Sequence, residues 1–74
     1  MGDEIGDRKL EGNALDNLGL AFHDRGEVER AIEKYEQALK IARESGDRSG
    51  EANRLGNLGN AYDSLDNEIG RAHV

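Results

Sequence analysis

The chain has 74 residues, no cysteine and a net charge of −6, from sixteen acidic and ten basic residues. These counts exclude disulfides and cysteine-bound metals, and the acidic balance leaves no basic stripe that could follow nucleic-acid phosphates. The two histidines have no partners at metal-ligand spacing, and no apolar run reaches the length of a membrane span. We therefore expect one small cytoplasmic domain with no metal or other cofactor, which binds neither nucleic acid nor membrane.

The first half of the chain has the pattern of a helical hairpin. Residues 1–7 are rich in glycine and acidic residues and are expected to form a flexible lead-in. Apolar residues then recur at helical spacing, which predicts a helix from about Arg8 to Arg25 that ends at Gly26, a favoured C-cap residue. A second helix from about Val28 to Glu44 must fold back on the first, so residues 8–45 form one antiparallel pair. The apolar residues expected between the two helices are Leu15, Leu18, Phe22, Ala31, Ile32, Tyr35, Ala38, Leu39 and Ala42.

The chain repeats itself after forty residues. Residues 6–25 and 46–65 align without a gap and agree at ten of twenty positions. A fixed period of this length indicates a helical solenoid, and residues 46–74 form its second, truncated unit. The repeated Gly19 and Gly59 lie within predicted helices, where glycine costs about 1 kcal/mol relative to alanine. Close approach of a neighbouring helix would explain both.

The third helix begins near Ser49, capped by Asp47 or Ser49, and two interpretations of its end stay open. Asp66 and Asn67 can form a turn, after which a short fourth helix would begin at Ile69. Alternatively, spacings of 3, 4, 3, 4 and 3 continue one apolar face through Leu55, Leu58, Tyr62, Leu65, Ile69 and Ala72. In either case the third helix lacks a full-length partner in its own chain, which predicts a homo-oligomer, a dimer formed with or without exchange of this helix. The residues expected at that contact are Leu58, Tyr62, Leu65 and Ile69.

The pattern of large, small and aromatic residues resembles the tetratricopeptide repeat. The residues that carry the resemblance are Leu15, Leu18, Gly19, Phe22, Ala31, Tyr35 and Ala38. The forty-residue period and the Gly-Asp-Arg start of each unit are similar to the longer-repeat branch found in kinesin light chains and spindle-orientation adaptors. The resemblance implies an all-α fold, in which antiparallel helix hairpins build one and a half to two repeats of an α-solenoid.

The same resemblance implies a non-enzymatic scaffold whose first helices line a concave groove for a peptide or helix of a partner protein. The groove positions hold Asn13, Asp16, Asn17, Leu20 and His23 in the first unit, and Asn53, Gly56, Asn57, Asn60 and Asp63 in the second. Asparagines offer donors and acceptors to an extended backbone without net charge. The alternative is a solvated face on which Asn17 and Asn57 bond to a neighbouring helix.

Two further features of the sequence restrict the ligands and activities that we expect. The family's carboxylate clamp needs a lysine and an asparagine one turn apart, but Asp16 and Leu20 stand there, so a chaperone C-terminus is not the expected ligand. Asp16, Asp24 and Asp63 are expected on the surface, without the cavity that would shift a catalytic pKa. We expect no enzyme. The alternative function is a self-assembling helical module whose main role is homo-oligomerisation.

Overall fold

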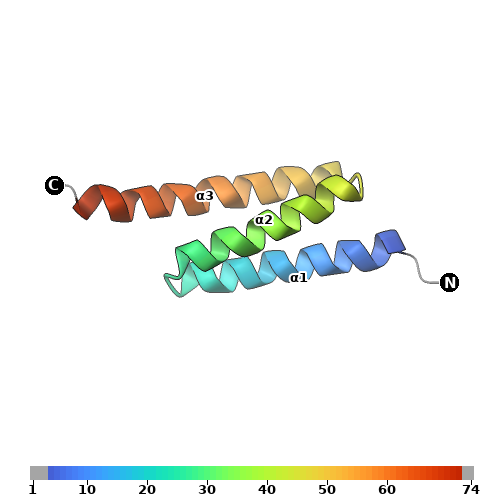
Figure 1. Cartoon of the computed structure of the whole chain (residues 1–74), viewed down its shortest axis with the longest axis horizontal. Helices are drawn as coiled ribbons and strands as arrows, with labels where there is room; N and C mark the ends of the chain where they lie inside the picture. Colours follow the sequence, from blue (N-terminus) through green and yellow to red (C-terminus); the bar gives the residue numbers. More distant parts are fainter. Residues whose placement is uncertain (1–3, 73–74) are drawn as a thin grey trace.

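A computed structural model describes residues 4–72 of the chain, and the side chains of residues 7–67. It contains three helices, α1 (Glu4–Asp24), α2 (Val28–Glu44) and α3 (Arg48–Ala72). Each helix runs antiparallel to the one before it, so α1 and α3 point the same way, and α2 packs against both of them (Figure 1). The all-α fold of antiparallel helix pairs is confirmed.

Both turns end their helix with a glycine in the left-handed region, Gly26 at φ +83° and Gly46 at φ +71°. The amide that follows each glycine donates back into the last helical turn, from Glu27 to the Phe22 carbonyl (2.8 Å) and from Asp47 to the Ala42 carbonyl (2.9 Å). This is the Schellman arrangement, which satisfies carbonyls that the helix leaves unpaired. The predicted role of Gly26 is confirmed.

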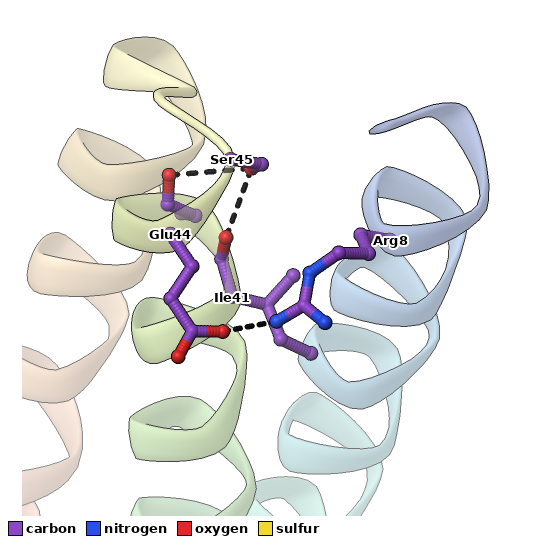
Figure 2. Close-up of polar contacts among 5 residues, drawn as sticks. Arg8, Ile41, Glu44 and Ser45 are labelled. Carbon is purple, nitrogen blue, oxygen red and sulfur yellow. Dashed lines mark hydrogen bonds and ion pairs between the residues drawn. The ribbon is translucent and has the colours of Figure 1, made fainter. Parts of the chain in front are cut away.

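Side-chain contacts also stabilise the C-terminal end of α2. The Ser45 hydroxyl donates to the Ile41 carbonyl (2.9 Å), and Arg8 of α1 forms an ion pair with Glu44 beside the Ile41 side chain (Figure 2). Because Arg8 and Glu44 are both exposed, their ion pair contributes less than about 1 kcal/mol. It helps to fix the first turns of α1 against the end of α2.

The N-terminus of α3 is capped by a side chain. Asp47 Oδ1 accepts a hydrogen bond from the Gly50 backbone N–H at 3.0 Å, which confirms one of the two predicted caps. Such a cap contributes about 1 kcal/mol, because it satisfies an amide that has no acceptor within the helix.

The start of α1 differs from the predicted one, and the end of α3 decides between the two interpretations left open. α1 begins at Glu4, earlier than the predicted Arg8, since an acidic first turn is favourable at the positive end of a helix dipole. α3 runs unbroken from Arg48 to Ala72, so the continuous helix is the correct one of the two interpretations. No residue other than glycine has positive φ in the described part of the chain, so Asn67 does not form the left-handed turn that a fourth helix would need.

The core lies on both flanks of α2. Every residue predicted for its inner face is buried, and Val28 and Ile41 are buried as well. Tyr35 is 1% exposed and lies flat against α1: a Cβ added to Gly19 would stand 2.5 Å from ring atom Cε1. The predicted close approach at Gly19 is therefore confirmed. The core cluster comprises Val28, Ala31, Ile32, Tyr35, Leu39, Leu58 and Ala61, with Phe22 and Leu65 packed against it.

The outer flanks of α1 and α3 are not covered. Leu18 is 47% exposed, Leu55 46% and Tyr62 48%, so the expectation that Leu18 packs between the first two helices is wrong. Leu18 precedes Gly19 and therefore points about a quarter turn away from the face of α1 that packs on α2. Nothing lies within 4 Å of a Cβ built on Gly59, so the close approach of a helix predicted there is wrong within the described chain. α2 packs against α1 on one side and against α3 on the other. No further helix of the described chain is left to cover the outer flanks of α1 and α3.

Candidate functional site

Three side-chain hydrogen bonds join α1 directly to α3, and in each the two residues are 41 positions apart. The pairs are Asn13–Arg54 (2.8 Å), Asp16–Asn57 (2.7 Å) and His23–Ser64 (3.0 Å). They lie along the length of the two parallel helices like rungs, and we call them the α1–α3 rungs. Because polar pairs of this kind need defined geometry, they fix the axial register of α3 on α1.

Arg54 is the most buried of the rung residues. It is 6% exposed, and its Nη2 donates to Asn13 Oδ1 while its Nε has no acceptor in the described part of the chain. The equivalent residue of the first unit is Ala14, which is exposed. Sequence reasoning missed Arg54, although an arginine where the other repeat has alanine was the available signal.

The remaining groove residues are open to solvent. Leu58 and Ala61 mark the face of α3 that packs on α2. At 100° per residue, Asn53, Asn60 and Asp63 point more than a quarter turn away from that face. On α1, Asn17 and Leu20 point away from α2 in the same manner, and Leu20 is 44% exposed. The residues that are open on this side are Asn17, Leu20, Asn53, Gly56, Asn60 and Asp63, and we call them the open groove residues.

Comparison with known proteins decides the family. A family model described as tetratricopeptide repeat matches residues 10–73. The chain is a tetratricopeptide repeat protein. The comparisons with curated proteins and with solved structures found no match.

Tetratricopeptide repeats form a non-catalytic scaffold family, and in general they mediate interactions between proteins. Among the described residues no group of three or more His, Cys, Asp or Glu side chains is placed to hold a metal ion. No helix in the described part of this repeat protein has both the length and the apolar character needed to cross a membrane.

The predicted groove residues of this repeat protein thus divide into two sets. Asn13, Asp16, His23 and Asn57 take part in the α1–α3 rungs, whereas the open groove residues are exposed. The bond from Asn57 to a neighbouring helix is the contact that the solvated-face interpretation expects, but the described contacts give Asn17 no such bond. Binding of a partner by either set stays a prediction.

The residues predicted for self-association are placed unequally. Leu58 is buried against α2, so it is not available on the surface while α2 and α3 stay together, and Leu65 is partly buried against the same core. Tyr62 is half exposed, and Ile69 lies outside the residues whose side chains the structure describes. Only Tyr62 of the described residues in this set is largely exposed, and self-association through them stays a prediction.

Tyr62 also has a polar contact. Its hydroxyl donates to Glu36 Oε2 at 3.0 Å, on the solvent side of α2. This hydrogen bond raises the pKa of the Tyr62 phenol above its ordinary value, with smaller contributions from desolvation and from the Glu36 charge. The hydrogen bond fixes the Tyr62 ring at the edge of the core, next to the uncovered flank of α3.

Proposed function

We propose that this chain is a protein-interaction module that binds an extended segment of a partner protein on the side of α1 and α3 opposite α2. One observation carries the proposal: the open groove residues lie on two parallel helices that the α1–α3 rungs hold in register. Side chains on rigid helices keep their spacing, so a partner is bound without first ordering the surface.

The chemistry of the open groove residues indicates the kind of segment that fits. Asn17, Asn53 and Asn60 each carry a donor and an acceptor, which suits the alternating N–H and C=O groups of an extended main chain. Leu20 offers an apolar contact of the kind that fits one side chain of the segment. Asp63 and the net charge of −6 favour a segment that carries basic residues.

The forty-residue period supports a finer placement within the family. A unit of this length, beginning with Gly-Asp-Arg at residues 6–8 and again at 46–48, agrees with the longer-repeat branch that includes kinesin light chains. We therefore assign the two units to that branch, as part of this proposal.

The test uses a displayed library of random peptides, with affinity for the selected peptides measured by calorimetry. Asn60→Ala and Asn17→Ala are expected to weaken binding about tenfold each, since a tenfold loss corresponds to about 1.4 kcal/mol, the scale of one well-made hydrogen bond. Gln37→Ala, at an exposed position on α2, is the matched control and should leave affinity unchanged. Equal losses at Gln37 and Asn60 would contradict the proposed surface.

Asn57→Ala separates a contact role from a structural one. Its amide donates to Asp16, so we expect the substitution to loosen α3 from α1 as well as to change the groove. Weaker peptide binding with an intact helical circular-dichroism signal would assign Asn57 to the partner contact. Loss of that signal together with binding would assign it to the fold.

A further inference from the structure

We infer that α3 pairs in antiparallel fashion with α3 of a second copy of this chain, so that Leu55 of each copy packs on Gly59 of the other. The pairing uses a face that the proposed groove does not occupy and that the fold contacts only at the Tyr62 hydroxyl, which bonds to Glu36. It therefore goes beyond the proposed function and can fail without affecting it.

The face is a single stripe along α3 that points away from α1. Its residues are Arg48, Ala52, Leu55, Gly59, Tyr62 and Asp66, and we call them the open stripe. Their spacings of 4, 3, 4, 3 and 4 keep them on one side of the helix. All six are exposed, and Leu55 and Tyr62 are 46% and 48% exposed respectively. From Arg48 to Asp66 the stripe is roughly 27 Å long, at a rise of 1.5 Å per residue.

The open stripe is complementary to itself when it is reversed about its midpoint, which lies level with position 57. Reversal places Leu55 opposite Gly59 of the second copy, and Tyr62 opposite Ala52. Each large side chain thus meets a small one, the alternation that lets two helices interdigitate. The two central contacts occur twice by symmetry, as an isologous interface requires.

Charge follows the same symmetry. Reversal about the same point places Arg48 opposite the second copy's Asp66 at both ends of the stripe. Within the described part of one chain, neither Arg48 nor Asp66 has an ion-pair partner. The two end pairs favour the antiparallel arrangement, because a parallel pair would place like charges side by side.

The first repeat shows what kind of side chain a glycine at this position can accommodate. Gly19 lies beneath the Tyr35 ring, whereas a Cβ on the equivalent Gly59 would meet nothing within 4 Å. In the proposed pair, Leu55 of the second copy occupies the space above Gly59 that Tyr35 occupies above Gly19. Each copy has one open stripe, so the assembly closes at two chains.

Asn53 and Asn60 remain outside this contact, since at 100° per residue they point about a third of a turn or more away from the centre of the open stripe. Each copy in the pair therefore keeps its open groove residues accessible. The only other uncovered apolar flank of the described chain contains Leu10 and Leu18 on α1, 68% and 47% exposed. If α1 of one copy packed on α3 of the next, rings or filaments of more than two copies would form instead of dimers.

Sedimentation velocity over a wide range of protein concentration tests the pairing. In about 0.15 M salt, where charges are screened over about 8 Å, the mass should rise from 8.1 kDa toward twice that value. Leu55→Glu should raise the dissociation constant at least tenfold, while Leu18→Glu, the control on α1, should not. A monomer at every concentration, growth beyond two chains, or dissociation by Leu18→Glu alone would overturn the inference.

Charge exchange tests the register. Arg48→Asp and Asp66→Arg, made singly, each place like charges opposite each other and should weaken the dimer severalfold. The double variant restores both pairs with reversed sign and should recover the original dissociation constant. Because both residues are exposed, circular dichroism should show unchanged helix content in all three proteins. Equal dissociation constants in the single variants, or no recovery in the double one, would refute the antiparallel register.

Discussion

Alanine at Gly19 and at Gly59 should change the stability of this protein in opposite directions, although the two glycines occupy equivalent positions in the repeat. Alanine is favoured over glycine within a helix by about 1 kcal/mol, and both substitutions gain this term. At Gly59 the new methyl group meets nothing within 4 Å, so the gain of about 1 kcal/mol is retained.

At Gly19 the methyl group would stand 2.5 and 2.7 Å from two ring atoms of Tyr35. The Tyr35 side chain is 1% exposed, so its ring cannot move into solvent to make room. Overpacking of this kind costs about 1–3 kcal/mol, and the short distances place it near the upper end. After the helix-propensity gain is subtracted, Gly19→Ala should destabilise the fold by about 2 kcal/mol.

The two variants should therefore differ by about 3 kcal/mol, which corresponds to roughly 12 °C or more in melting temperature for a domain of this size. Urea and thermal unfolding, followed by circular dichroism, measure the difference at a concentration where sedimentation shows single chains. Gly56→Ala, at another helical glycine with nothing within 4 Å, should stabilise as Gly59→Ala does. If Gly19→Ala also raised the melting temperature, the packing of Tyr35 against the α1 backbone would be refuted.

Other substitutions test the cap, the rungs and the core. Asp47→Ala should lower the free energy of unfolding by about 1 kcal/mol, because it removes the cap of α3. Asp47→Asn keeps a side-chain acceptor and should retain most of the stability, so an equal loss in both variants would contradict the cap. Asn13→Ala should lower the free energy of unfolding by about 1 kcal/mol, since it removes the acceptor of the buried Arg54 guanidinium. In the same urea unfolding assay, Arg54→Met should be neutral or stabilising. Stability unchanged by Asn13→Ala would argue against that rung. Burial and, to a smaller extent, the charges of Asp16 and Asp24 raise the pKa of the Tyr35 phenol above 10.0. The stability that the neutral phenol contributes to the fold is therefore fully present below pH 10 and is lost as pH rises through the native pKa. Stability should accordingly fall above pH 10, and Tyr35→Phe should reduce that fall; an unchanged pH profile in the variant would assign the loss to other groups.

The local signals in the sequence were sufficient for the helices and the turns. Glycine at 26 and 46, the periodic apolar face of α2 and the forty-residue repeat are each set by short-range chemistry. The end of α3 was left open, because Asp66 and Asn67 are compatible with a turn as well as with a helix. The structure has a helix there, in keeping with the unbroken apolar spacing.

Burial on α1 and α3 could not be predicted from local pattern, because it depends on position in the stack. Leu18 and Leu58 are equivalent residues, yet Leu18 is 47% exposed and Leu58 is 7% exposed. Leu58 has α2 beside it, whereas the described chain places no helix on the corresponding flank of α1. The α1–α3 rungs were predicted only in part for a similar reason: a bond from Asn57 to a neighbouring helix was one alternative, but its partner Asp16 depends on the axial register of two helices.

Nuclear magnetic resonance mapping of a selected peptide tests the binding surface most directly. In a titration of the labelled protein, the side-chain amide signals of Asn17, Asn53 and Asn60 should shift most, together with the backbone amide of Leu20. The signal of Gln37 on α2 should stay in place. Shifts concentrated on α2, or on the open stripe with the asparagine signals unmoved, would contradict the assignment of partner binding to the groove of α1 and α3.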